Sequence, residues 1–183
     1  MISDNELVER FLSGDSTAFD ELVIRHQRQV FATAYRMVRN AETAEEIVQE
    51  TFLRAFKGVR SFRRKAGFNT WLYRIAMNVC YDELKRHQKG VELGSDFPDT
   101  ADDKTVNPPH EEMAKEERKA WLERQIELLP FKQKSALVLR VFQDMSFKEI
   151  ARTLGCSTVS ARVNYRHAIL KLKNVLAHSG EDL

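Results

Sequence analysis

The segment at residues 62–79 interleaves aromatic side chains with arginines and carries an amide near its end. Aromatic rings and guanidinium planes stack on exposed bases, cations follow phosphates, and an Asn amide can pair with the edge of a base. The segment therefore has the residue types needed to hold single-stranded nucleic acid. The side chains that could do so are Phe62, Arg63, Arg64, Asn69, Arg74 and Asn78.

Part of this segment also has a purely structural explanation. Trp71, Leu72 and Ile75 recur at the spacing of a helical stripe, which is the pattern of side chains that pack into a core. For Trp71 the spacing favours the core over a contact with a base. The two arginines of the loop and Asn78 fall off this stripe, so the nucleic-acid interpretation depends mainly on them.

A second set of candidate binding residues lies near the C-terminus. The run SFKEIARTLGCS predicts a short helix with a capping box between Ser146 and Glu149, a turn at Gly155, and a new cap at Ser157. The next helix, at about residues 158–173, contains Arg and Lys but no Asp or Glu. This pattern is typical of a helix-turn-helix whose second helix enters the DNA major groove. The alternative for this segment alone is an ordinary helical hairpin with a solvated basic face.

The sequence contains no group of residues arranged for catalysis or for metal binding. Its five histidines are scattered, and Cys80 and Cys156 lie far apart, outside any CxxC or Cys/His cluster. There is no nucleophile paired with a base and no glycine-rich phosphate loop. We therefore expect no metal, no disulfide and no cofactor, and an enzyme is the least favoured class of function.

Charge and hydropathy predict the subcellular location of the protein. No apolar run approaches membrane-spanning length, and Asp4 and Glu6 make the start too acidic for a signal peptide. These features predict a cytoplasmic protein without membrane insertion. The net charge is only +2, yet ten Lys and Arg fall within residues 54–89, directly after the glutamates of residues 42–50. This segregation of charge predicts surfaces for different partners.

Helical periodicity dominates the chain and predicts an all-α fold. A short first helix is expected to be capped by Asp4 and to stop at Gly14. A long second helix is expected to be capped by Asp15 or Ser16 and to end at Asn40. Further helices are expected at about residues 41–56, from just after residue 70 to about 86, and at about 111–129 and 132–142.

Residues 90–109 differ in composition from the rest of the chain. Glycines and prolines break any helix there, and aspartates make the stretch acidic and poor in apolar residues. We expect a flexible acidic linker at residues 91–110. The chain is thus predicted to form two small helical domains, 1–90 and 111–183, the second containing the helix-turn-helix.

Two long motifs resemble one known family. The runs EEIVQETFLRAF at residues 45–56 and TWLYRIAMN at 70–78 resemble the second region of extracytoplasmic-function sigma factors, which are small two-domain bacterial transcription initiation factors. The C-terminal part, from LLP at residues 128–130 through FKEIA at 147–151 to residue 172, resembles their fourth region. The resemblance covers nearly the whole chain except the linker.

The resemblance implies a function for each set of residues. It implies that the acidic helix binds core RNA polymerase, through Glu45, Glu46, Gln49, Glu50 and Leu53. It implies that the basic, aromatic segment captures a base flipped from the melted minus-ten element, through Phe62, Arg63, Arg64, Asn69, Arg74 and Asn78. It implies that the helix-turn-helix reads the duplex minus-thirty-five element, through Ser157, Arg162, Val163, Arg166 and His167. An anti-sigma factor is a further partner implied by the family.

The start of the reading helix departs from the commonest family pattern. Many members have Gly-Thr-Val-Lys-Ser-Arg there, whereas this chain has TVSARVNY at residues 158–165. The chain resembles instead the members with an Asn-Tyr pair, and the register of the reading residues depends on Asn164 and Tyr165. Lys171 and Lys173 are expected to contact phosphate or solvent.

The main alternative is a helix-turn-helix regulator that binds DNA without joining polymerase. Such a regulator would need neither an acidic docking helix nor a pocket for single-stranded DNA. The acidic helix at residues 45–54, beside the basic, aromatic segment, therefore favours the sigma factor.

Overall fold

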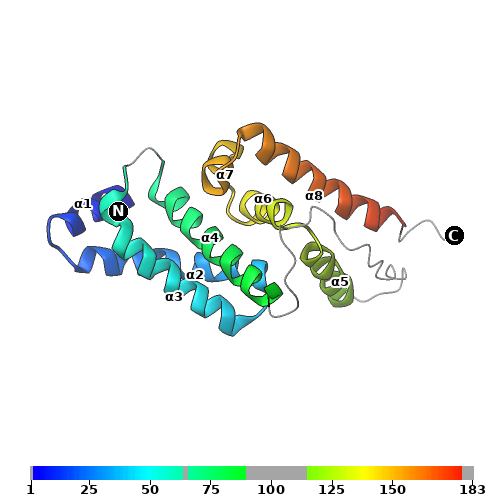
Figure 1. The fold of residues 1–183 in the computed structure, drawn as a ribbon, viewed down its shortest axis with the longest axis horizontal. Helices are drawn as coiled ribbons and strands as arrows, with labels where there is room; N and C mark the ends of the chain where they lie inside the picture. The colour runs from blue at the N-terminus through cyan, green and yellow to red at the C-terminus, as the bar shows by residue number, and fades with distance from the viewer. Residues whose placement is uncertain (1, 64–65, 90–114, 179–183) are drawn as a thin grey trace.

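The computed structural model describes residues 2–63, 66–89 and 115–178. These residues form helices joined by short turns, without any strand, and this confirms the predicted all-α fold (Figure 1). No helix in the described ranges is both long and apolar enough to cross a membrane. The elements in chain order are α1 (Asp4–Leu12), α2 (Thr17–Val38), α3 (Ala41–Gly58), the 3-10 helix η1 (Val59–Ser61), α4 (Phe68–Lys89), α5 (Lys115–Glu127), α6 (Phe131–Phe142), α7 (Phe147–Leu154) and α8 (Thr158–His178).

The first helix is capped one residue earlier than predicted. Ser3, not Asp4, accepts from the backbone N–H of Glu6, and the Glu6 carboxylate bonds the Ser3 N–H at 2.7 Å in a reciprocal capping box. Asp4 turns instead toward α2, where its Oδ2 lies 2.7 Å from Nε2 of His26. The prediction for Asp4 was therefore wrong, because a neighbouring hydroxyl takes the cap and frees the carboxylate for a tertiary contact.

The junction between α2 and α3 is a sharp turn fixed by two residues. Arg39 takes the left-handed backbone conformation (φ 57°) and ends α2, and the Asn40 side chain accepts from the backbone N–H of Thr43 at 2.8 Å to cap α3. The helix thus ends at Val38, two residues before the predicted end at Asn40, and Asn40 caps the next helix instead. The turn reverses the chain so that α3 packs along α2 (Figure 1).

The fourth helix begins at Phe68, three residues before the expected start. The Phe68 ring is buried and lies 5.5 Å from the ring of His26 and 5.7 Å from that of Trp71. Burial of this ring anchors the first turn, and the backbone N–H of Trp71 bonds the Gly67 carbonyl at 3.2 Å. The sequence prediction missed this start because a tertiary contact, the burial of Phe68 against His26, anchors it.

The helix-turn-helix has the predicted local structure. Ser146 and Glu149 form a reciprocal capping box at the start of α7. Gly155 takes a left-handed conformation (φ 64°) that ends α7, as residues without a Cβ do at little cost. Ser157 then accepts from the backbone N–H of Ser160 at 3.0 Å and caps α8.

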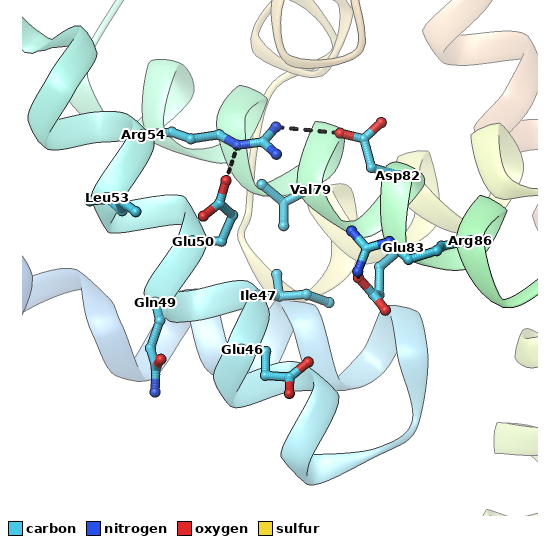
Figure 2. Close-up of a pocket in the computed structure, with 10 residues that line it drawn as sticks. All are labelled: Glu46, Ile47, Gln49, Glu50, Leu53, Arg54, Val79, Asp82, Glu83 and Arg86. Atoms are coloured by element: carbon cyan, nitrogen blue, oxygen red, sulfur yellow. Dashed lines mark hydrogen bonds and ion pairs between the residues drawn. The ribbon is translucent and has the colours of Figure 1, made fainter.

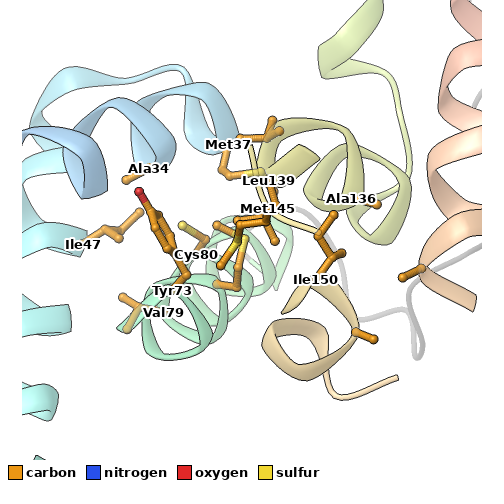
Figure 3. Packing of buried hydrophobic residues seen from close by; sticks show 14 of the residues in the cluster. Ala34, Met37, Ile47, Tyr73, Val79, Cys80, Ala136, Leu139, Met145 and Ile150 are labelled. Atoms are coloured by element: carbon orange, nitrogen blue, oxygen red, sulfur yellow. The ribbon is translucent and has the colours of Figure 1, made fainter. Parts of the chain in front are cut away.

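Three buried clusters hold the described helices together, and the smallest of them packs Leu137 of α6 against Ala168 of α8. One packs α1–α4 around aromatic and aliphatic side chains such as Phe19, Leu22, Phe52 and Leu72. Another joins α2, α3 and α4 to α6 and α7, so the two predicted domains share a core (Figure 3). The predicted linker at residues 91–110 lies outside the described residues.

Candidate functional site

An open groove lies between α3 and α4 (Figure 2). Its walls carry four carboxylates, two guanidinium groups and one exposed apolar side chain, that of Leu53, while the apolar residues at its base are buried. Within it, Arg54 Nε lies 2.6 Å from Glu50 Oε1 and its Nη1 lies 3.3 Å from Asp82 Oδ2, so one arginine ties the two helices together. The lining residues are Glu46, Ile47, Gln49, Glu50, Leu53, Arg54, Val79, Asp82, Glu83 and Arg86.

The groove brings together most of the residues that the acidic motif predicted. Glu46, Gln49, Glu50 and Leu53 all line it, and Leu53 is 47% exposed although it is apolar. Glu45 is exposed on the same helix but does not line the groove. The sequence analysis missed the contribution of α4, whose Asp82 and Glu83 were visible as acidic residues in an otherwise basic stretch.

The segment before α4 supports the helix and also presents polar groups. Arg63 is exposed, whereas Phe62 is buried, with its ring 5.3 Å from that of Trp71 and 5.9 Å from that of Phe68. The expectation that Phe62 offers a ring to a base is not met, because the ring fills the core under the loop. Arg64 lies outside the described residues.

The first turns of α4 divide into a buried and an open side. Arg74 and Asn78 are exposed and stand four residues apart, hence on one face of the helix. Trp71, which the pattern assigned to the core, is half-buried against Phe62 and Phe68. Asn69 is half-buried, and its Oδ1 has no hydrogen-bond partner among the residues that the structure describes. A buried acceptor of this kind carries an energetic cost unless a donor reaches it.

One face of α8 combines arginines with apolar side chains. Arg162, Val163 and Arg166 are exposed, and Val159, which the sequence analysis did not single out, is 70% exposed. These four positions follow the i, i+3, i+4, i+7 pattern and so form one continuous stripe. The opposite side of the helix buries Ala161 and Ala168.

The other two predicted residues of this region, His167 and Ser157, differ in whether their side chains are available for a contact with DNA. His167 is exposed beside the stripe. Ser157 is exposed as well, but its hydroxyl oxygen already caps the helix and lies 2.9 Å from the Ser160 hydroxyl. Ser157 therefore positions α8. The Arg162 guanidinium lies 5.7 Å from the centre of the Phe147 ring, which orients it at the start of the stripe.

No group of histidines, cysteines and carboxylates in the described ranges could hold a metal ion. Cys80 is buried, and burial raises the pKa of its thiol to about 12, so it is an unreactive core residue. Cys156 is half-buried and its pKa is also raised by burial. The arrangement offers binding surfaces, an acidic one on α3 and α4 and a basic one on α8.

Comparison with known proteins defines the class of this fold. The family model of Sigma-70 region 2 matches residues 22–90, and that of Sigma-70 region 4 matches residues 119–172. The helices that form the acidic groove therefore lie in the match to region 2, and the helix-turn-helix lies in the match to region 4.

Curated relatives give the family within that class. The chain is 34% identical over 175 residues to the RNA polymerase sigma-H factor of Pseudomonas aeruginosa, covering 87% of this chain and 88% of that protein. It is 32% identical over 176 residues to the ECF RNA polymerase sigma factor SigM of Mycobacterium tuberculosis, covering 96% and 86%. It is 33% identical over 171 residues to the ECF RNA polymerase sigma-E factor of Escherichia coli, covering 88% and 89%. The chain belongs to the extracytoplasmic-function (ECF) family of RNA polymerase sigma factors.

Solved structures agree with this fold. The structure of CnrH in complex with the cytosolic domain of CnrY superposes with a TM-score of 0.71 at 22% identity, covering 97% of this chain and 99% of that one. The sigma factor RpoE from Bartonella quintana, in complex with the anti-sigma factor NepR, gives a TM-score of 0.66 at 18% identity, covering 87% and 96%. The family assignment favours a sigma factor over the regulator that acts without polymerase.

Proposed function

We propose that this sigma factor docks on core RNA polymerase through the groove between α3 and α4. The groove has more carboxylates than guanidinium groups, and Leu53 stands exposed among them. Such a surface suits a partner that is basic with an apolar centre, because complementary charge steers the encounter and apolar burial holds the complex. Glu45 adds charge to the rim from the same helix.

The open side of α4 and the loop before it are proposed to take the melted minus-ten element. Arg63, Arg74 and Asn78 present cationic and amide groups to solvent, and Asn69 holds an acceptor without a partner in the described part of the chain. Extruding a base costs a few kcal/mol, which hydrogen bonds and stacking in a shaped site can offset. Trp71 is half-buried beside these groups in the sequence and is proposed as the ring for stacking, and Arg64, next to Arg63 in the sequence, adds a further cation.

The stripe on α8 is proposed to read the minus-thirty-five element in duplex form. Arg166 and Arg162 can each donate two bonds to a guanine, and Val163 can contact a thymine methyl. His167 lies beside the stripe and Ser157 fixes the start of the helix. Lys171 and Lys173, further along α8, are assigned to the phosphate backbone.

The function is proposed to be binding without catalysis, in the cytoplasm where polymerase and chromosome meet. The observation that carries it is the presence, in one chain, of an open acidic groove and a separate exposed stripe of arginine and valine. The domain limits are proposed as 1–90 and 111–183, joined by 91–110. An anti-sigma factor is a proposed further partner, since the similarly folded RpoE is found in complex with one.

The test is a binding measurement with three samples on one promoter fragment: the chain alone, core polymerase alone, and both. A complex that depends on promoter sequence is expected only when both are present. The net charge of +2 gives the chain little electrostatic attraction of its own for DNA. Nanomolar, sequence-specific binding by the chain alone at physiological salt would contradict the proposal and favour the simple regulator.

A further inference from the structure

Val159 is the most exposed large apolar side chain in the described ranges, at 70%. A single exposed valine is common on protein surfaces and needs no partner of its own. Val159 differs in its place, because it is the second residue of α8, the helix whose exposed stripe is proposed to enter the major groove. Residues near the N-terminus of such a helix are the ones that reach base edges.

The side chain of Val159 points away from the rest of the C-terminal helices. Successive residues turn by about 100° around a helix, so Val159 lies about 160° from Ala161 and about 180° from Ala168. Both alanines are fully buried. The direction of Val159 falls between those of Arg162 and Val163, so it lies near the midline of the stripe.

The turn that carries Val159 is fixed by hydrogen bonds on both sides. The Ser157 hydroxyl oxygen accepts from the backbone N–H of Ser160 at 3.0 Å, and the Ser157 carbonyl accepts from that of Ala161 at 3.0 Å. The Asn164 amide donates to the Ser160 carbonyl at 2.9 Å. A valine on such a backbone has one strongly preferred rotamer, so it loses little conformational entropy on binding.

A valine can recognise only one feature of the major groove. It has no hydrogen-bond donor or acceptor, so it cannot read the polar edges of guanine, cytosine or adenine. Thymine carries an apolar group there, the C5 methyl, which distinguishes it from the other bases. Burial of one methyl group in such a contact is worth roughly fourfold in affinity.

The two valines of the stripe are one helical turn apart. Four residues advance about 6 Å along a helix axis, and successive base pairs lie about 3.4 Å apart along the duplex. A helix that follows the groove therefore places Val159 and Val163 over positions about two base pairs apart, with Arg162 between them.

We propose that Val159 is a further specificity-determining residue, which selects a thymine in the minus-thirty-five element through its C5 methyl group. This thymine lies about two base pairs from the one that Val163 contacts. The inference rests on the proposed function of α8 and adds a base to the sequence that the helix reads.

Removal of single methyl groups from the DNA tests the contact. Core polymerase with the full-length chain first selects the best promoter from a library randomised in the minus-thirty-five element. Each thymine of the element is then replaced in turn by deoxyuridine, which lacks only the C5 methyl. The affinity of the wild-type complex should fall roughly fourfold at each of two positions. Val159→Ser should remove the sensitivity at one of them, and Val163→Ser the sensitivity at the other.

Two further variants control for changes that do not concern the methyl contact. Val141→Ser alters an exposed valine on α6, away from the stripe, and should keep both sensitivities. Val159→Ile keeps a branched apolar side chain at the site and should also keep both. Circular dichroism checks that every variant retains the helix content of wild type.

Three results would overturn the role of Val159: a best element without thymine, a Val159→Ser protein still sensitive to uracil at both positions, or one that weakens every fragment equally. Discrimination by Arg162 and Arg166 would survive each of these results. Absence of any complex that depends on the minus-thirty-five sequence, with wild type, would instead overturn the proposed function of α8 and this inference with it.

Discussion

Four exposed side chains of α8 carry the proposed reading of duplex DNA: Val159, Arg162, Val163 and Arg166. The arginines are one turn apart on a helix whose other side is buried, so a base edge can meet both. Lys173 is exposed as well but lies two turns beyond Arg166. Position along the helix therefore separates residues that read bases from those that touch phosphate.

Replacement of the reading arginines should change specificity, whereas replacement of the lysine should not. Arg166→Ala and Arg162→Ala should each cost about 1 to 3 kcal/mol on the best promoter and relax preference at one base pair. Lys173→Ala, the matched control, should weaken all promoters about equally. Transcription from a library randomised in the minus-thirty-five element measures this, and identical sequence preferences for both arginine variants and wild type would show that neither reads sequence.

Asn78→Ala should reduce DNA melting more than it reduces binding to polymerase. The side chain is exposed on α4, outside the buried stripe, so its removal should leave stability within about 0.5 kcal/mol of wild type. Asn5→Ala, an exposed amide on α1, is the control. Permanganate footprinting of the minus-ten region measures melting, and reactivity equal to that of the control would leave Asn78 without a role in the melted strand.

Lys134 should make stability depend on alkaline pH. Burial lowers its pKa to about 8 from the ordinary lysine value of 10.5, so between these pH values the unfolded chain binds more protons than the folded one. The free energy of unfolding of wild type should therefore rise relative to that of Lys134→Met between pH 8 and 10.5, by at most about 3 kcal/mol, and stay parallel below pH 8. Urea unfolding across this range measures it. Lys132→Met, on the exposed side of α6, should follow wild type, and a Lys134→Met curve that also does so would refute the shift.

The roles of single side chains were predictable where they depend only on neighbouring residues in the sequence. Capping of α7 and α8 by Ser146 and Ser157 was confirmed, because a cap depends only on residues within one turn. Phe62 was assigned wrongly because an aromatic residue beside arginines looks the same in sequence whether its ring stacks on a base or fills a core. Burial against Phe68 and Trp71 is a tertiary contact that no local pattern encodes.

At the scale of elements, the sequence of α3 predicted one wall of the acidic groove but not the other. The glutamates of α3 could be recognised from their clustering, and four of the five predicted residues line the groove. The second wall comes from α4, about thirty residues later, where Asp82 pairs with Arg54. Pairing of α3 with α4 follows from packing of their apolar stripes, and this sets which charges face each other.

Reversal of charge in the groove should weaken docking without unfolding the chain. Glu46 is exposed, so Glu46→Lys should change stability by less than about 0.5 kcal/mol while repelling a basic partner. Gln27→Lys/Gln29→Lys adds the same two units of positive charge on an exposed face of α2 and controls for net charge. Affinity for core polymerase, measured by fluorescence anisotropy, should fall at least tenfold for Glu46→Lys alone. Wild-type affinity in a folded Glu46→Lys protein would rule out the groove as the docking site.

At the scale of the whole molecule, the sequence indicated two helical regions and their order, and family membership agrees. It did not indicate that the regions share a core. The contacts that join them link residues far apart in the chain, such as Thr33 with Gln143 and Met37 with Lys134. Periodicity shows that a helix has an apolar face, but it does not show which other helix covers that face.

The central claim is that the chain directs polymerase to promoters, and run-off transcription tests it most directly. Core polymerase with the chain, on a library of genomic fragments, should initiate at discrete sites preceded by two shared sequence elements at constant spacing. Core polymerase with Glu46→Lys, at a concentration that half-saturates polymerase with wild type, should give several-fold fewer of these starts. Absence of specific starts with wild type, while the chain alone still binds particular fragments tightly, would contradict the account.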